Sequence, residues 1–185
     1  MPVNEQKAAV RRAVRASFDE AKRQQESRLI CQHVLAWEPY QRAQVVGGYM
    51  PMKHEADILP VLQHALESGK TLVLPRCGQA PQMTFHQVKC LDELVRGSFG
   101  LLEPSEDAPV VPTDRIDLLL TPLEGITRDG LRLGKGGGYY DCLLAKGQIA
   151  TLGIVLSWQW AEKLPRETWD QPLYAAADQQ GIHLF

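Results

Sequence analysis

The sequence has few cysteines, and it has neither a long apolar run nor an excess of charge of one sign. The four cysteines contain no Cys-x-x-Cys pair, which argues against a zinc site or a disulfide framework and fits a reducing compartment. They are Cys31, Cys77, Cys90 and Cys142. No apolar run reaches the length of a membrane span, and the N-terminus resembles neither a signal peptide nor a transit peptide. We therefore expect a cytoplasmic protein that does not enter a membrane.

The net charge of the chain is −2 at pH 7, so no overall electrostatic field attracts nucleic acid. A length of 185 residues is the size of one domain, and the sequence shows no internal repeat and no linker. We expect one domain over residues 1–185, which acts as a monomer on small molecules and has no nucleic-acid partner.

The sequence also lacks the short motifs of several common enzyme classes. It has no Gly-x-Ser-x-Gly elbow, no His-Glu-x-x-His pair and no heme-type cysteine run. Its five histidines show no metal-ligand spacing, which favours structural or surface roles for them.

What stands out instead is the stretch Gly130-Leu-Arg-Leu-Gly-Lys-Gly-Gly-Gly-Tyr-Tyr-Asp141, with four glycines in five residues. Glycine tolerates positive φ and lets several amide N–H groups face one anion, while Arg132 and Lys135 suit phosphate. A flexible surface loop and an anion cradle fit this composition equally well. The stretch is neither a P-loop, since Asp129 and Gly136 break the pattern, nor a dinucleotide fingerprint, since Tyr139 replaces a glycine.

Apolar periodicity predicts an α/β fold. Helices are expected at about 5–21, 27–37, 57–68 and 139–145, and strands at 45–50, 71–75, 83–88, 116–123 and 151–156. The run at 116–123 is the most apolar, so we expect a central strand that leads directly into the glycine stretch. Ligands of such parallel sheets bind beyond the carboxyl ends of the strands, where Met50, Glu55 and Asp57 fall. A carboxylate there is either a helix-terminal residue or a contact to a polar substrate ring.

The expected N-terminal helix has two rows of side chains. Val10, Val14 and Phe18 form an apolar stripe that we expect to pack on the core. Lys7 and Arg11, in line with Arg15, form either a solvated basic face or, if the helix reaches the glycine stretch, a set of phosphate ligands.

The segment from Arg132 to Asp141 closely resembles the signature of the 5-formyltetrahydrofolate cyclo-ligase family, whose members are also called methenyltetrahydrofolate synthetases. The resemblance covers nearly the whole chain, because further matches follow in the family's order. They are Lys7 and Arg11; Tyr49, Pro51, Glu55 and Asp57; Pro75, Met83, Phe85, Glu103, Pro104 and Asp117; and Gln159, Leu164, Pro165, Trp169 and Asp170.

The resemblance implies a three-layer, Rossmann-like α/β domain whose mostly parallel sheet is flanked by helices. It implies ATP-dependent conversion of 5-formyltetrahydrofolate to 5,10-methenyltetrahydrofolate, with Mg²⁺ and with release of ADP and phosphate. The residues that it assigns to ATP are Lys7, Arg11, Arg132, Leu133, Gly134, Lys135, Gly136, Gly137, Gly138, Tyr139 and Tyr140. It assigns the folate to Met50 and Glu55, magnesium to Asp141 and Asp170, and the place where phosphate and formyl group meet to Lys135 and Tyr139.

Two departures from the family pattern leave alternatives open. Many members have Ala-Phe-Asp where this chain has Gly125-Ile126-Thr127, so a carboxylate is missing unless Asp129 or Glu124 replaces it. The segment Ala175-Ala-Ala-Asp-Gln-Gln also lacks the usual Val-Thr. One alternative is a non-catalytic folate- or nucleotide-binding relative, and another is a sugar-phosphate or CoA-type enzyme that shares only the fold.

Overall fold

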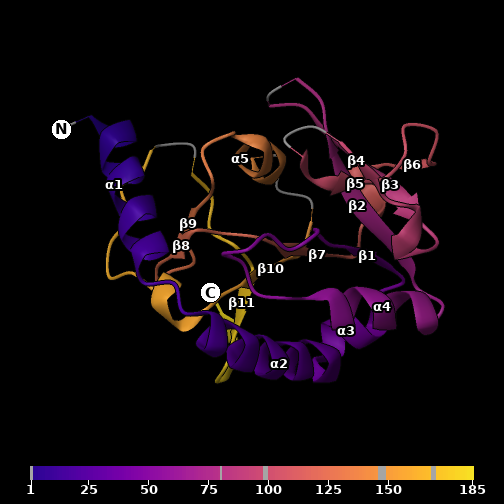
Figure 1. Ribbon diagram of the computed structural model, residues 1–185, viewed down its shortest axis with the longest axis horizontal. Coiled ribbons are helices and arrows are strands. Elements are labelled where there is room, and N and C mark those ends of the chain that lie inside the picture. Colours follow the sequence, from indigo (N-terminus) through magenta and orange to yellow (C-terminus); the bar gives the residue numbers. More distant parts are fainter. Residues whose placement is uncertain (1, 80, 98–99, 146–148, 168–169) are drawn as a thin grey trace.

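A central sheet with the strand order β12-β11-β10-β7-β1-β2-β3-β6 runs through the computed structural model (Figure 1). The structure describes residues 2–79, 81–97, 100–145, 149–167 and 170–185. The parallel strands are β1 (Val45–Gly47), β2 (Thr71–Cys77), β7 (Leu118–Thr121), β10 (Thr151–Ile154) and β11 (Ala175–Asp178). The antiparallel strands at the two edges are β3 (Met83–Val88), β6 (Val110–Val111) and β12 (Gly181–Leu184). The predicted mostly parallel α/β sheet is confirmed.

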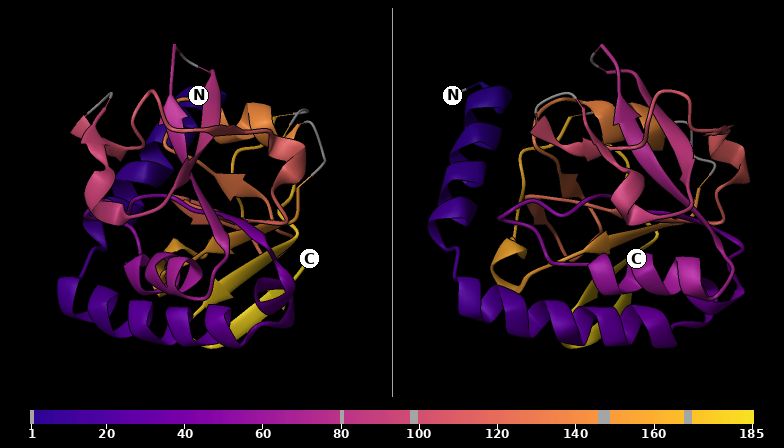
Figure 2. Two further views of the ribbon diagram at one scale, coloured as in Figure 1. Left: turned by 90° about the vertical axis from the view of Figure 1, so that its right-hand side faces the viewer. Right: turned by 45° about the vertical axis from the view of Figure 1, so that its right-hand side comes forward.

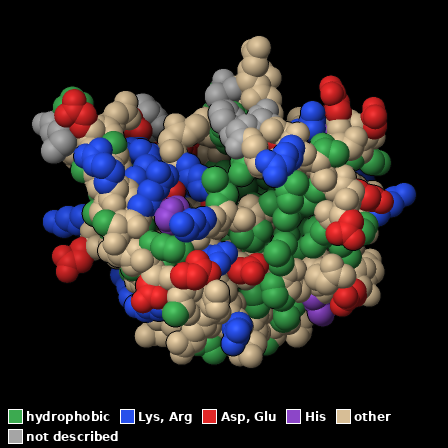
Figure 3. All heavy atoms as spheres, viewed as in Figure 1, with side chains coloured by type: hydrophobic (Ala, Val, Ile, Leu, Met, Phe, Trp, Pro, Cys, Tyr) green, Lys and Arg blue, Asp and Glu red, His purple; other side chains and the backbone are tan. Residues whose placement is uncertain are grey.

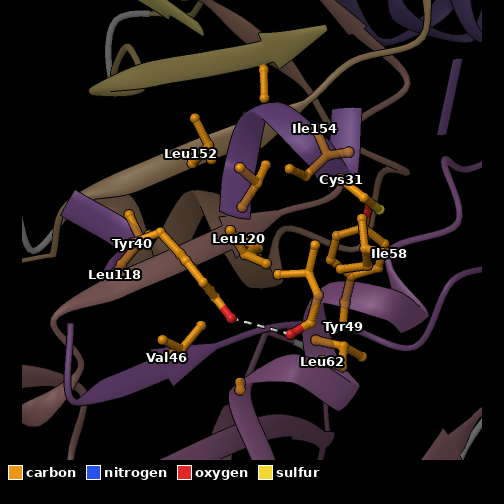
Figure 4. Close-up of a cluster of buried hydrophobic side chains, with 14 of the residues drawn as sticks. Cys31, Tyr40, Val46, Tyr49, Ile58, Leu62, Leu118, Leu120, Leu152 and Ile154 are labelled. Atoms are coloured by element: carbon orange, nitrogen blue, oxygen red, sulfur yellow. Dashed lines mark hydrogen bonds between the residues drawn. The ribbon is translucent and has the colours of Figure 1, made fainter. Parts of the chain in front are cut away.

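Helices cover both faces of this sheet. On one face lie α2 (Glu20–Ala36), α3 (Glu38–Arg42) and α4 (Leu59–Glu67), and on the other lies α5 (Tyr139–Leu144) (Figures 1 and 2). In the larger core, Tyr40 of α3 packs among strand side chains such as Val46 and Leu118, and its hydroxyl donates to the Val61 carbonyl 3.3 Å away (Figure 4). On the opposite face, Leu143 of α5 packs with Leu119 in a smaller core. These are the three layers that the resemblance implies.

The strand β7 is fully buried along its length, as a continuous apolar run predicts for the centre of a parallel sheet. The chain runs from β1 outward to β2 and β3, and it then returns to place β7 on the other side of β1. Connections therefore leave the carboxyl ends of β1 and β7 in opposite directions, and a crevice opens between them. This is the part of the fold where a ligand is expected.

The first two predicted helices are wrong in their bounds. The helix α1 (Val3–Ala16) ends before Phe18, and α2 begins where the Asp19 side chain accepts a hydrogen bond of 3.0 Å from the Lys22 amide. Aspartate is a favoured N-cap, so Asp19 is the residue in the sequence that marks the start of a second helix. The expected packing stripe is only partly buried, because Val10, Val14 and Phe18 are all half-buried and α1 has no fully buried residue. Phe18 lies between the helices and packs against the ring of His54, with the centroids 4.7 Å apart.

The expectation that the central strand leads directly into the glycine stretch is wrong. A hairpin of β8 (Gly125–Ile126) and β9 (Arg132–Leu133) lies between them, so Arg132 is a strand residue. Two strands that the periodicity did not predict, β11 and β12, follow the strand at 151–156. A second hairpin consists of β4 (Val95–Arg96) and β5 (Leu102–Glu103), and single 3-10 turns are η1 (Leu91–Glu93), η3 (Thr113–Arg115) and η4 (Ser157–Gln159).

Within the described ranges, no helix is both long enough and apolar enough to cross a membrane.

Candidate functional site

A cavity of about 350 Å³ opens at the carboxyl ends of β1, β2 and β7. Its walls come from the loop after β1, from the end of β2 and the start of β3, from the segment around β5, and from residues 132–141. The volume is in the range of small-molecule sites. Figure 3 shows basic side chains grouped on the left of this face of the molecule and hydrophobic side chains to the right of them.

The glycine loop, which we define as residues 134–138, connects β9 to α5 along one wall of the cavity. Gly136 and Gly138 have φ values of 103° and 71°, a left-handed region that side chains disfavour. None of the amides of residues 135–138 donates to an acceptor within the described part of the chain. The loop is therefore held at both ends and has donors available for an anion, which favours the cradle over the flexible loop.

Arg132 lies beneath this loop, and only 4% of its side chain is exposed. Its guanidinium is 2.5 Å from Oδ1 of Asp141, donates to the Pro122 carbonyl at 3.2 Å and lies 5.4 Å from the centroid of the Tyr140 ring. The Nε of Arg132 has no partner among the residues that the structure describes. The arginine thus connects β9, the residue after β7 and the first turn of α5.

Lys135 connects the glycine loop to the loop after β1. Its Nζ lies 2.6 Å from Oε1 of Glu55, a carboxylate of which 5% is exposed. The other oxygen of Glu55 accepts the Met52 amide at 2.8 Å. Burial, with the charge of Glu55 adding to it, raises the pKa of the Tyr140 phenol far above its ordinary value of 10.0, so this hydroxyl stays neutral. The Tyr139 hydroxyl reaches the Gly78 carbonyl at 3.3 Å.

The basic row of α1 makes contacts with the rest of the domain, although 47% of the Arg15 side chain stays exposed. Arg11 donates from Nε to the Gly134 carbonyl at 2.7 Å, and Arg15 makes an ion pair of 2.8 Å with the buried Glu124. Burial lowers the pKa of the Arg11 guanidinium, and the positive charges of Arg15 and Arg132 act in the same direction. Such crowding of cations around one loop favours a polyanionic ligand.

Lys7, one turn before Arg11, contacts the carboxylates of Glu167 at 2.6 Å and Asp170 at 3.3 Å. Burial acts to lower the pKa of Lys7, but these two carboxylates raise it above its ordinary value. Arg11 thus contacts the glycine stretch, whereas Lys7 contacts two carboxylates of the C-terminal segment. That Lys7 and Arg11 are phosphate ligands stays a prediction.

Most of the predicted site residues line the one cavity. They are Met50, Glu55, Arg132, Gly134, Lys135, Gly136, Gly137, Gly138, Tyr139, Tyr140 and Asp141. Lys7 and Arg11 approach from α1 without lining it, and Leu133 is a core residue of β9. Asp170 is not on the cavity wall either, and its Oδ2 accepts both Lys7 and the Glu167 amide. No group of three or more His, Cys, Asp or Glu side chains with metal-binding geometry occurs in the described ranges.

The Thr127 departure has a local structural explanation. The Thr127 hydroxyl donates to Asp129 and accepts the Leu131 amide at 3.1 Å, so it closes the turn of the β8–β9 hairpin. Asp129 is exposed, and Glu124 is paired with Arg15. None of these three side chains lines the cavity. Trp169, one of the matched residues, lies outside the described ranges.

Sequence reasoning missed part of the apolar wall. Met52, Cys77, Leu101, Leu102 and Pro122 line the cavity but were not expected there. Glu103 was matched to the family pattern, but its burial against the cavity was not foreseen. Met52 and Pro122 follow the parallel strands β1 and β7, a position that could have indicated them. Cys77, Leu101, Leu102 and Glu103 meet only because β5 lies against β2, and no local signal marks that contact.

The fold and the site together define an α/β protein that has a cation-lined anion cradle beside an apolar cavity at the switch point of its sheet. The sequence model of the 5-formyltetrahydrofolate cyclo-ligase family matches residues 3–177, and the chain belongs to this family. The membership expected from the Arg132–Asp141 segment is confirmed.

Individual relatives agree with this membership. The chain is 33% identical over 148 residues to the 5-formyltetrahydrofolate cyclo-ligase of Escherichia coli strain K12, which covers 77% of this chain and 81% of that protein. It is 28% identical over 169 residues to the Haemophilus influenzae cyclo-ligase, covering 88% and 90% of the two chains. The NMR structure of the 5,10-methenyltetrahydrofolate synthetase of Aquifex aeolicus matches with a TM-score of 0.85 and 28% identity, over 96% of this chain and 92% of that one.

Proposed function

We propose that this chain catalyses the ATP-dependent cyclisation of 5-formyltetrahydrofolate to 5,10-methenyltetrahydrofolate, with release of ADP and phosphate. The observation that carries the proposal is the Lys135–Glu55 ion pair of 2.6 Å, which joins the anion cradle to the loop after β1 across one cavity. Such a cavity can hold a phosphate donor and an apolar acceptor in contact with each other. Family membership gives the two ligands their identity.

The reaction needs an activated formyl oxygen, because oxygen leaves a formamide poorly. Transfer of the γ-phosphoryl group from ATP to that oxygen makes a phosphate leaving group and releases ADP. The substrate's N10 then attacks the formyl carbon and loses its proton, and departure of phosphate leaves the methenyl bridge. Such a sequence requires positioning and charge neutralisation, without a covalent nucleophile on the protein.

In this proposal the chain's own cations neutralise the phosphates. Lys7 and Arg11 approach from α1, the amides of the glycine loop supply donors, and Lys135 and Tyr139 lie where the phosphoryl group and the formyl oxygen meet. Arg132 orients the loop from below through Asp141 and the Pro122 carbonyl. Met50 and Glu55 form the adjoining folate side of the cavity.

A magnesium ion fits next to Asp141. Arg132 occupies only its Oδ1, 40% of the side chain is exposed, and the residue lies in the first turn of α5, which follows the glycine loop. Magnesium commonly takes one or two carboxylates together with substrate phosphates and water, so a large cluster of acids is not required. Asp170 can join Asp141 only if its oxygen is released from Lys7. When bound, the ion would neutralise phosphate charge.

The proposal includes action as a monomer in the reducing cytoplasm. All four cysteines lie among the described residues and are thiols. Size-exclusion chromatography with light scattering checks the oligomeric state.

The test follows the growth of the methenyl absorbance and the release of ADP from the purified chain. Turnover should require 5-formyltetrahydrofolate, ATP and Mg²⁺ together, and Asp141→Ala should abolish it. Asp114→Ala, a change at an exposed aspartate away from the cavity, is the matched control. A folded chain that binds 5-formyltetrahydrofolate tightly but releases no ADP would instead be a non-catalytic binding relative.

A further inference from the structure

A buried carboxylate on the cavity wall has an oxygen that the protein leaves unsatisfied. Glu103 of β5 is 3% exposed, and its Oε1 has no hydrogen-bond partner in the described part of the chain. A charged oxygen that is removed from water without a partner is costly, so the native fold retains one only where something else satisfies it. Because Glu103 lines the cavity, a ligand in the cavity can provide the missing donor.

The surroundings hold this carboxylate in place. The β5 strand pairs with β4, and Arg76 of β2 donates to the carbonyl of Pro104 at 2.9 Å. Gly97, at the end of β4, leaves room for the carboxylate, since a methyl group there would overlap it. The backbone of Gly97 is not in the left-handed region. Glycine is therefore needed here for the space that it leaves and not for its backbone conformation.

Next to Glu103 the cavity wall is apolar and suited to a flat ring. Leu101, Leu102, Met83 and Pro75 contribute to it. Arg76, which contacts the residue after Glu103, is directed to the Pro104 carbonyl and to the exposed Glu106. A ligand group that binds here therefore needs to be planar and apolar on its faces, and it needs to carry N–H donors at one edge.

Glu55, which also lines the cavity, differs from Glu103 in its contacts. Its Oε1 makes an ion pair with Lys135 although it has no hydrogen-bond partner among the described residues, and its other oxygen accepts the Met52 amide. The two acids therefore belong to different parts of the cavity. Glu55 lies on the folate side where this side meets Lys135 of the glycine loop, and Glu103 lies farther along the wall, on the side of β2.

We propose that Oε1 of Glu103 accepts hydrogen bonds from the amino group and the ring N–H of the pterin, and that Glu103 is a specificity-determining residue for the folate. This inference rests on the proposed function, because the pterin belongs to that substrate. It assigns the donor edge of the ring to the β5 side of the cavity, so the rest of the substrate extends toward Lys135.

The principal test is Glu103→Gln, which keeps the shape of the side chain and removes its charge. Loss of charge-assisted hydrogen bonds should raise KM for 5-formyltetrahydrofolate about 10- to 100-fold and leave KM for ATP unchanged. Equilibrium titration of the folate without ATP should show a matching loss of affinity. Glu106→Gln, which changes an exposed acid three residues away, is the control.

Two further measurements guard against a general folding defect. Gly97→Ala leaves Glu103 in the sequence but displaces its carboxylate, so it should reproduce the rise in KM. A substrate analogue without the 2-amino group should bind more weakly than the parent to the natural chain, but about equally to Glu103→Gln.

The outcomes separate this inference from the proposed function. A natural chain that shows no turnover refutes the proposed function. A natural chain that turns over and binds the desamino analogue as tightly as the parent refutes the role of Glu103, as does a folded Glu103→Gln variant with unchanged KM.

Discussion

The ammonium of Lys135 lies 2.6 Å from Oε1 of Glu55, so two loops that are far apart in the sequence meet in one ion pair across the cavity. The lysine is 37% exposed, whereas the glutamate is almost completely buried. The buried acid thus fixes the direction of a cation that is itself accessible to a ligand.

The first prediction concerns Lys135→Met. Because one well-placed donor to developing charge commonly contributes about 100- to 1000-fold in rate, kcat should fall by that order, and the urea midpoint should also fall because the buried Glu55 loses its cation. Steady-state kinetics and urea unfolding check the two halves. Lys89→Met, at an exposed lysine outside the cavity, should behave like the natural chain. An unchanged kcat would contradict the placement of Lys135 next to the reacting groups.

The second prediction compares two glycines with left-handed backbones. Gly136 of the glycine loop has φ 103°, and Gly69 after α4 has φ 77° with open space around it. Alanine at either position should cost about 1–2 kcal/mol of unfolding free energy, since both backbones are strained for a side chain. Only Gly136→Ala should also raise KM for ATP. If Gly69→Ala raised it equally, the effect would reflect global stability and not the cradle.

The third prediction concerns the buried guanidinium of Arg132. Arg132→Lys keeps the positive charge, but a single ammonium cannot reach Asp141 and the Pro122 carbonyl while lying over Tyr140. We expect a loss of about 1–3 kcal/mol in the free energy of unfolding, because buried polar groups lose partners. Urea titration monitored by circular dichroism measures it, and the exposed Arg28→Lys change should be neutral. If Arg132→Lys and Arg28→Lys had equal urea midpoints, this would contradict the structural role of the Arg132 guanidinium.

The fourth prediction concerns pH. Burial alone acts to raise the pKa of the Asp178 carboxyl, but hydrogen bonds from His183, the Gln180 amide and Trp160 bring it below its ordinary value of 3.8. A lowered folded pKa stabilises the protein above the unfolded value, and that stability is lost as pH falls through the folded pKa. Urea midpoints should therefore fall between about pH 5 and about pH 3, and the fall should be shallower in Asp178→Asn. Equal slopes in both chains would contradict this.

Part of the fold could be predicted because the signal for it lies within a short stretch of the sequence. The run at 116–123 is apolar throughout, and such a run is typical of a strand buried on both faces. In the same way, the glycines from Gly134 to Gly138 next to Arg132 and Lys135 indicate a loop that is either flexible or an anion cradle, without reference to other segments. The gathering of Met50 and Glu55 at the same cavity follows from their position after a parallel strand.

Other features could not be predicted, because they depend on contacts between distant segments. The strand β11 begins with Ala175-Ala-Ala, which has little intrinsic preference for a strand. These small side chains are fully buried where α2 packs against β11. The orientation of Glu103 depends on β5 lying over β2, and the hairpin that contains Arg132 depends on pairings of two residues each. Such pairings leave no periodic pattern in the sequence.

The attachment of α1 has a consequence for how a nucleotide would enter. This helix has no buried residue, and its basic row is held by Glu124, Glu167 and Asp170 together with the Gly134 carbonyl. A nucleotide that binds together with its cation would therefore exchange the existing ion pairs of these basic side chains for new ones, because the side chains are already paired. Lys7 would give up Asp170 for phosphate, and the freed aspartate would become available to magnesium. Net charge at the helix would then stay nearly constant throughout the exchange.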